Sequence, residues 1–178
     1  MLVMLGASAS GKTEIAKIII KKYGFKKMIT YTTRSMRPGE VDGVDYHFIN
    51  EEEFLKRKNQ NFFIETTLYN RHYYGTAFRD ASFDKVLIVD TCGANALYER
   101  LKSKVILFFL EAPEEIRRQR MIQRGDHEED IKRRLAEDAK YFVKERLLHI
   151  DFIINTNDLG LEDLADHVYE LYINHFLE

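Results

Sequence analysis

The chain has 178 residues, of which 45% are hydrophobic and 31% are charged, and it carries a formal net charge of −2 at pH 7. This length and balance predict one globular domain with a full core and argue against a disordered chain. The small net charge argues against a broad nucleic-acid-binding surface, so any anion that the protein recognises should be small. The single cysteine, Cys92, rules out an internal disulfide framework and predicts a protein of the reducing cytoplasm. The longest later apolar run, residues 105–110, is far shorter than a membrane span, so we expect no membrane partner.

The N-terminus contains the clearest motif. Residues 1–5 are apolar and precede a segment with the spacing glycine, four residues, then Gly11-Lys12-Thr13. This pattern predicts a strand followed by a phosphate-binding loop, because glycine permits backbone angles that turn successive N–H groups toward an anion. Lys12 would reach the β and γ phosphates of a nucleotide, Thr13 would ligate Mg²⁺, and a helix running to Gly24 would direct its positive end at the same site. The predicted ATP-binding residues of this loop are Gly6, Ala7, Ser8, Ala9, Ser10, Gly11, Lys12 and Thr13.

Residues 31–80 differ from the sequence on either side. Residues 25–30 predict a second strand, and Pro38-Gly39 then enforces a turn. Asn50 is a suitable cap for the helix that follows it. The short elements expected here are a hairpin-like region at 41–48, a helix at 51–58 and β segments at 62–67 and 73–76. We therefore expect residues 31–80 to form an insertion in an α/β domain.

Alternating strand-like and helix-like segments resume after residue 80. Residues 86–90 form an apolar run that predicts a buried parallel strand ending at Asp90. Because ligands bind at the carboxyl ends of strands in open α/β sheets, we expect Asp90 to lie near Mg²⁺, with helix capping as the alternative role. The further expected elements are strands at 105–110 and 152–155 and helices at 94–101, from 112 onward and from 161 onward. This alternation predicts a parallel sheet.

A charged segment at 117–135 contains many arginines and is interrupted at Gly125. A run of this kind is usually the solvated face of a helix. Because arginines lie on both sides of the glycine, we favour a flap that closes over phosphate groups.

Several motifs follow one another in an order that identifies a family. They are the loop at 6–13, Thr32-Thr33-Arg34, Arg37-Pro38-Gly39-Glu40, Asp45-Tyr46-His47-Phe48, Phe63-Ile64-Glu65, Tyr73-Tyr74-Gly75-Thr76 and Arg124-Gly125. In these motifs, and over essentially its whole length, the sequence resembles the guanylate kinases. The resemblance implies a P-loop α/β fold of the nucleoside monophosphate kinase type, with a five-stranded parallel core sheet and helices on both of its faces. It further implies a single domain over 1–178, made of a core (1–30, 81–119 and 141–178), a GMP-binding insertion (31–80) and a lid (120–140).

The resemblance also implies an activity and a set of site residues. The implied reaction is transfer of the ATP γ-phosphate to GMP or dGMP with Mg²⁺, which makes ATP and GMP the expected partners of a cytoplasmic monomer or homodimer. GMP-binding roles are implied for Thr30, Arg34, Arg37, Tyr46, Glu65, Tyr74, Thr76 and Asp90. Catalytic roles are implied for Lys12, Arg34, Arg124 and Arg134, further ATP contacts for Arg120 and Asn155, and metal contacts for Thr13 and Asp90.

Some positions depart from the family pattern. Ala7 and Ala9 stand where proline and a further glycine are usual, and Ile88 stands where a second aspartate is common. Tyr31 and Thr66 replace a frequent serine and a frequent aromatic residue. Two alternatives therefore remain: a related kinase acting on another small phosphate, which Glu65 and Thr76 argue against, and a non-catalytic phosphopeptide-binding module, which Lys12 and the arginine-bearing lid argue against.

Overall fold

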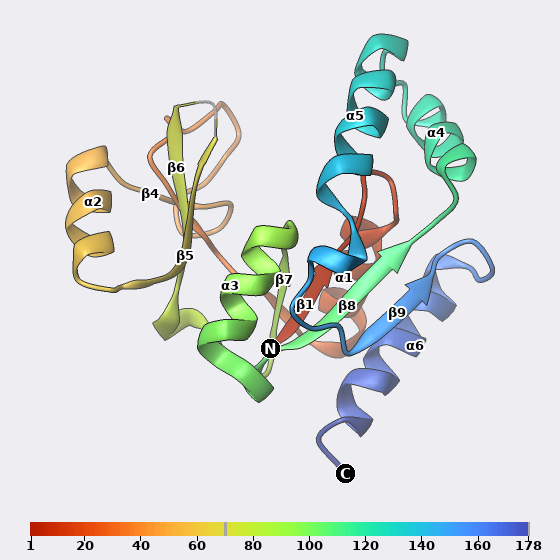
Figure 1. Cartoon of the computed structure of the whole chain (residues 1–178). Coiled ribbons are helices and arrows are strands. Elements are labelled where there is room, and N and C mark those ends of the chain that lie inside the picture. Colours follow the sequence, from red (N-terminus) through yellow and green to blue (C-terminus); the bar gives the residue numbers. More distant parts are fainter. Residues whose placement is uncertain (70, 178) are drawn as a thin grey trace.

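The computed structural model describes residues 1–69 and 71–177, and its centre is a five-stranded parallel sheet (Figure 1). The strand order is β2-β7-β1-β8-β9, and every neighbouring pair is parallel. The strands of this core sheet are β1 (Leu2–Leu5), β2 (Lys26–Lys27), β7 (Lys85–Ile88), β8 (Ile106–Glu111) and β9 (Phe152–Asn155). The predicted five-stranded parallel sheet is thus confirmed.

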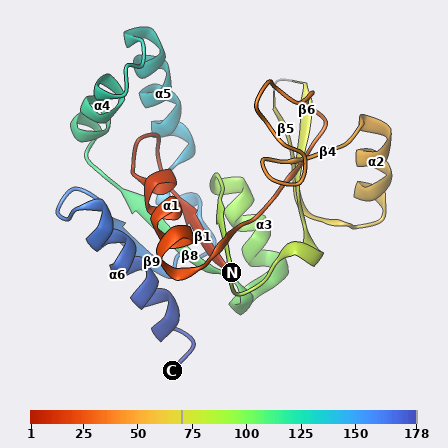
Figure 2. The same cartoon turned by 180° about the vertical axis from the view of Figure 1, so that it is seen from behind.

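Helices cover both faces of this sheet, as predicted. Leu2 and Met4 of β1 pack in one apolar cluster with α1 (Lys12–Tyr23) and α6 (Leu161–Asn174), whereas Val3 and Leu5 pack in another with α3 (Thr91–Leu101). Successive side chains of a strand point to opposite faces, so a strand that is apolar at every position is buried on both sides. Figure 2 shows the same arrangement from behind. Within the described residues, none of the helices has the length and apolar character needed to cross a membrane.

The segment between β2 and β7 forms a second sheet. Its order is β4-β3-β6-β5, with antiparallel pairing of β3 with β6 and of β5 with β6. Its elements are β3 (Tyr31–Thr32), β4 (His47–Phe48), α2 (Glu51–Asn59), β5 (Phe63–Tyr69), β6 (His72–Ala77) and the short 3₁₀ turn η1 (Phe78–Asp80). Asn50 caps α2 as predicted, because its Oδ1 accepts a hydrogen bond of 2.8 Å from the Glu53 amide. Phe54 of α2 stacks on Phe63 and so joins the helix to the sheet.

The structure differs from two predictions about this region. The strand expected over residues 25–30 is present but shorter, at Lys26–Lys27, and the Met28 amide still donates to the Val86 carbonyl of β7 at 2.9 Å. The chain then crosses to the second sheet, where the Thr30 carbonyl accepts from the His47 amide. Residues 41–48 do not form a hairpin. His47 and Phe48 pair in parallel with β3, and the turn before them is held by the Asp45 carboxylate, which accepts from the Val41 amide at 2.8 Å.

The charged segment forms a pair of helices, α4 (Glu114–Gln123) and α5 (Glu128–Tyr141). Gly125, at φ 84, provides the left-handed turn between them. Met121 of α4 and Ile131 and Leu135 of α5 form a small apolar cluster, which leaves the arginine-rich faces of both helices outside it. Figure 1 shows this pair on the opposite side of the core from the second sheet. The remaining short elements are the 3₁₀ turns η2 (Lys102–Lys104) and η3 (Lys144–Arg146).

Candidate active site

The phosphate-binding loop connects the carboxyl end of β1 to the start of α1. A Cβ at Gly6 would lie 2.1 Å from the Leu110 carbonyl oxygen, so β8 leaves room only for glycine at this point. Ala9 and Gly11 both adopt positive φ angles, of 59° and 92°. A left-handed angle at Ala9 explains why the family usually has glycine at that position, since alanine reaches this conformation less readily.

Lys12 folds back over this loop. Its Nζ donates to the carbonyl oxygens of Gly6 and Ala7, both at 2.7 Å, and to Ser10 Oγ at 3.2 Å. Burial lowers the pKa of Lys12 to about 8, while the nearby Asp138 carboxylate opposes this shift and Arg117 adds to it. The ammonium group is thus held at the loop by neutral oxygens. A charged phosphate oxygen accepts a stronger hydrogen bond from an ammonium group than a neutral oxygen does, so an approaching phosphate could replace them.

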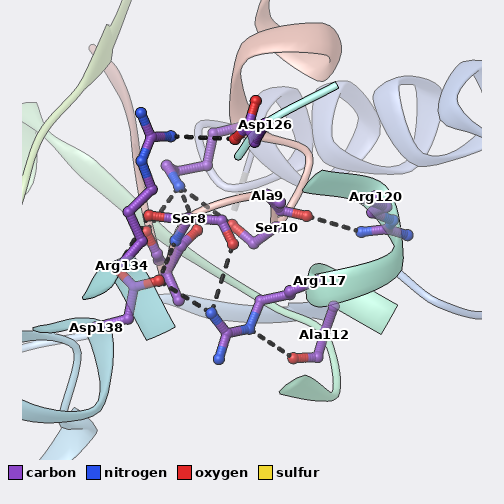
Figure 3. Close-up of polar contacts among 12 residues, drawn as sticks. Ser8, Ala9, Ser10, Ala112, Arg117, Arg120, Asp126, Arg134 and Asp138 are labelled. Carbon is purple, nitrogen blue, oxygen red and sulfur yellow. Dashed lines mark hydrogen bonds and ion pairs between the residues drawn. The ribbon is translucent and has the colours of Figure 1, made fainter. Parts of the chain in front are cut away.

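A cleft of about 430 Å³ opens beside the loop. Its walls include Ala9, Gly11, Lys12, Thr13, Arg120, Arg124 and Thr156. Arg120 spans the cleft wall, donating to the Ala9 carbonyl at 3.2 Å (Figure 3) and to the Thr156 carbonyl at 2.6 Å. The loop, the start of α1 and α4 therefore surround one space at the carboxyl edge of the sheet, where a nucleotide is expected.

Asn155, a predicted ATP contact, is not among the residues that line this cleft, whereas its neighbour Thr156 is. The Asn155 Oδ1 instead accepts a hydrogen bond of 2.9 Å from the Asn157 amide. Thr156 is buried, and its hydroxyl accepts from Arg120 at 3.1 Å. The signal that could have found Thr156 is its place immediately after the carboxyl end of β9.

A second pocket, here called the acceptor pocket, lies where the second sheet meets β7. Gly75, Ile88 and Gly93 are among its walls. It also brings together six of the residues to which GMP binding was assigned, namely Thr30, Tyr46, Glu65, Tyr74, Thr76 and Asp90. These residues come from five separate segments of the chain, so their grouping is a result of the fold.

Glu65 is the most buried acid of the acceptor pocket. Its Oε1 accepts a hydrogen bond of 2.7 Å from the Thr76 hydroxyl, and Thr76 is 1% exposed. Burial raises the pKa of Glu65, the Thr76 hydrogen bond opposes this shift, and the charge of Asp90 adds to it. A carboxylate in this setting needs hydrogen-bond donors from a ligand, because the protein supplies only part of what it can accept.

Asp90 caps a helix, which is one of the two roles considered for it. Its Oδ1 accepts from the Gly93 amide at 2.7 Å and so caps α3. The residue is nevertheless exposed and lines the acceptor pocket. The helix cap fixes the carboxylate at the pocket, so capping and a ligand contact are compatible.

Arg34 and Arg37 lie on the loop that follows β3, and neither is among the residues that line the acceptor pocket. Arg34 forms a two-point contact with Glu40, with Nη2 to Oε1 at 2.6 Å and Nη1 to Oε2 at 3.0 Å. Its guanidinium lies 5.5 Å from the ring centre of Tyr46, which lines the pocket. Arg37 is exposed, and its backbone amide donates to the same Glu40 carboxylate at 2.7 Å. Glu40 thus holds the loop that carries both arginines.

Arg124, directly after α4, and Arg134 of α5 meet at Asp126, which is not one of the predicted site residues. Arg124 pairs with Asp126 through both carboxylate oxygens, with Nε to Oδ1 at 2.9 Å. Arg134 approaches the same carboxylate at 3.7 Å (Figure 3). Arg34 and the pair Arg124 and Arg134 therefore each contact a carboxylate of their own segment, and the structure does not bring them to one point.

The residues assigned to metal binding supply hard oxygen atoms. Thr13 lines the cleft beside the phosphate loop, and Asp90 lines the acceptor pocket. Residues 1–69 and 71–177 contain no group of three or more histidine, cysteine or acidic side chains that could hold a metal ion. A hydroxyl and a carboxylate suit Mg²⁺, which commonly keeps phosphate and water among its ligands. The donor set fits an ion that arrives with a nucleotide.

Comparison with known proteins identifies the family of this chain. The sequence profile of the family described as guanylate kinase matches residues 1–173. The chain belongs to the guanylate kinase family. It is therefore an ATP-dependent nucleoside monophosphate kinase, a phosphoryl transferase that binds nucleotides.

Individual relatives and a solved structure agree with this family. The guanylate kinase of Symbiobacterium thermophilum is 36% identical over 168 residues, which cover 90% of this chain and 79% of that protein. The guanylate kinase of Desulfotalea psychrophila is 34% identical over 170 residues, covering 90% and 82%. The crystal structure of guanylate kinase from Anaplasma phagocytophilum aligns with a TM-score of 0.69 at 23% identity, over 100% of this chain and 86% of that one. The structural match supports the fold.

Proposed function

We propose that this guanylate kinase family member transfers the γ-phosphate of ATP to GMP or dGMP in the presence of Mg²⁺. The observation that carries the choice of acceptor is the half-buried Glu65 carboxylate, held by Thr76 in the acceptor pocket. Guanine presents its N1–H and its exocyclic amine as neighbouring donors, and a carboxylate accepts at both oxygens. Adenine presents an acceptor at N1 and would face the carboxylate lone pairs. The pocket therefore favours guanine.

The proposed division of the chain follows from the two sites. Residues 31–80 would bind the acceptor, residues 120–140 would act as the lid, and the core sheet would hold ATP at the phosphate loop. Arg34 and Arg37 would bind the acceptor phosphate, since arginine pairs with phosphate oxygens through two parallel hydrogen bonds. Arg124 and Arg134 would exchange Asp126 for the transferred phosphoryl group when the lid closes.

Catalysis would come from positioning and charge stabilisation, without a covalent intermediate. Lys12 would exchange the carbonyls of Gly6 and Ala7 for phosphate oxygens, and the arginines would neutralise charge on the group in transit. Thr13 and Asp90 would hold Mg²⁺, and the ion when bound would supply further neutralisation of phosphate charge. Closure would exclude water and so limit hydrolysis of ATP.

The two alternatives each conflict with a feature of the structure. A non-catalytic phosphopeptide-binding module would have no use for the cleft beside Lys12 and Thr13. A kinase for a sugar phosphate would have no use for a half-buried carboxylate that lacks a cationic partner, as Glu65 does within the described residues. We propose the cytoplasm as its location, because Cys92 is a free thiol at the surface.

A panel of acceptors tests this function. With saturating ATP, GMP and dGMP should support ATP consumption in a coupled assay, whereas AMP, CMP and UMP should do so poorly. Because a buried charge left without its partner is strongly unfavourable, we expect kcat/KM for GMP to exceed that for AMP by about 10⁴-fold. Equal rates with AMP, or a preference for a non-nucleotide phosphate, would contradict the proposed acceptor.

A further inference from the structure

A buried ion pair lies next to the phosphate loop and has no part in the mechanism above. Arg117 of α4 and Asp138 of α5 are 8% and 7% exposed, and Arg117 Nη1 donates to Asp138 Oδ2 at 3.0 Å (Figure 3). Most ion pairs of this protein lie at the surface, whereas both members of this pair are almost fully shielded from water. Burying two charges is unfavourable in itself, and an apolar pair of similar size is often equally stable. The pair therefore calls for an explanation other than stability.

Both charged groups contact the same residue of the phosphate loop, Ser8. The Ser8 amide donates to Asp138 Oδ2 at 2.9 Å, and the Ser8 hydroxyl donates to Asp138 Oδ1 at 3.1 Å. Arg117 Nη1 also donates to the Ser8 carbonyl at 3.5 Å, and its Nε donates to the Ala112 carbonyl at 3.3 Å. Ser8 is thus held at its amide, its hydroxyl and its carbonyl by one ion pair.

The pair acts on the loop from outside the nucleotide cleft. Arg117 and Asp138 line a separate hollow, together with Ala7 of the loop and Phe142 beyond α5. The cleft wall is instead formed by the later loop residues, including Gly11 and Lys12. A ligand in the cleft therefore has no need to displace Asp138, and the contacts with Ser8 can persist when ATP is bound.

The same two helices carry the arginines assigned to phosphate chemistry. Arg120 and Arg124 lie on or directly after α4, and Arg134 lies one turn before Asp138 on α5. Arg120 makes its own contact with the loop, at the Ala9 carbonyl. The helices and the loop are consequently joined at two neighbouring loop residues, Ser8 and Ala9, and only the contact at Ser8 uses a buried ion pair.

We infer that Arg117 and Asp138 are positioning residues, which fix Ser8 and with it the shape of the phosphate loop for ATP. This inference rests on the proposed function, since ATP is the ligand that the loop would hold. Neither side chain would touch the substrate. Removing the pair should weaken ATP binding and leave the acceptor pocket unaffected, because that pocket is lined by other segments.

The test separates positioning from stability by comparing a single and a double variant. Asp138→Ala leaves Arg117 buried without its partner, so this variant should unfold more easily and bind a non-hydrolysable ATP analogue more weakly. R117M/D138A removes both charges, so its unfolding midpoint should return toward that of the wild type. Ser8 has lost its contacts with Arg117 and Asp138 in the double variant. The dissociation constant of the double variant for the ATP analogue should therefore remain about tenfold above that of the wild type. The dissociation constant for GMP should change by less than about twofold.

Two further variants serve as controls. Asp166→Asn removes the charge of an acid that joins α6 to Lys22 and Tyr23 at the far end of α1, and it should leave ATP-analogue binding unchanged. Ser8→Ala keeps the ion pair but removes the hydroxyl that Asp138 accepts from, and it should weaken analogue binding by a few-fold. Ser8→Ala decides the matter if the double variant does not fold.

The outcomes are distinguishable. If R117M/D138A recovers both stability and ATP-analogue binding, or if Ser8→Ala binds the analogue as the wild type does, the pair is structural only and the inference is wrong. A wild-type protein that binds the analogue but transfers no phosphate to GMP would contradict the proposed function and leave the binding comparison valid. A wild-type protein that binds no ATP analogue would overturn both.

Discussion

Glu65→Gln should lower kcat/KM for GMP by about 10²-fold or more, because the new amide offers guanine one acceptor and one donor in place of two acceptors. The donor would face the N1–H or the amine of the base, and one of these groups would lose its partner. KM for ATP should change by less than about twofold, since the cleft beside Lys12 is lined by other residues. Steady-state kinetics with each substrate varied in turn measures both effects.

The pH dependence of kcat/KM for GMP should also differ between the wild type and Glu65→Gln. Burial raises the pKa of Glu65, so the carboxylate form that guanine requires is lost at a higher pH than for an exposed glutamate. In the wild type, kcat/KM for GMP should therefore fall as the pH is lowered through the raised pKa of Glu65. This acidic limb should be absent in Glu65→Gln, whose side chain does not titrate.

A matched control makes the same glutamate-to-glutamine change in α2, the helix that packs on the second sheet. Glu53 of α2 accepts from Arg57 Nε at 2.7 Å and is half-buried, outside the acceptor pocket. Glu53→Gln should retain wild-type acceptor selectivity and the wild-type acidic limb. If Glu65→Gln also kept both, the carboxylate would have no part in reading the base, and an acceptor other than GMP would become the better hypothesis.

Lys12→Met should reduce turnover by about 10²–10³-fold or more, the range found when a preorganised donor to a developing negative charge is removed. Methionine retains most of the side-chain volume, and the partners that Lys12 leaves are two loop carbonyls and the Ser10 hydroxyl. The variant should therefore stay folded. Turnover measured at saturating ATP and GMP, together with a thermal unfolding curve, separates the loss of chemistry from the loss of structure.

Lys21→Met serves as the control for that experiment, because Lys21 is an exposed lysine in the last turn of the same helix. Its turnover should match that of the wild type. A folded Lys12→Met protein with near-normal turnover would contradict the role of the phosphate loop in catalysis.

The features that the sequence predicted well are local or follow one motif. The strand, loop and helix at the N-terminus are contiguous, and the structure places β1 at Leu2–Leu5 and α1 at Lys12–Tyr23. The strand predicted at 152–155 is found as Phe152–Asn155. The grouping of Glu65, Thr76 and other acceptor residues was implied by the family resemblance, since no spacing along the chain brings five segments together.

The features that could not be predicted from the sequence depend on contacts between segments far apart along the chain. Ser8 and Asp138 are separated by 130 positions. Arg117 lies in the charged run at 117–135, which is typical of an exposed helix face, and Asp138 lies three residues beyond the end of that run. Their burial arises only because α4 and α5 pack against the phosphate loop. The division of residues 25–30 between two sheets is similar in origin, because the competing partner for Thr30 is His47 of the second sheet.

Following the γ-phosphate itself tests the central claim most directly. ATP labelled at its γ-phosphate is incubated with the protein, Mg²⁺ and GMP, and the nucleotides are separated. The label should appear in GDP, with one ADP formed for each GDP, and ATP should stay largely intact when GMP is omitted. Label that is released as inorganic phosphate in the presence of GMP, or that remains in ATP, would contradict a phosphoryl transfer to GMP.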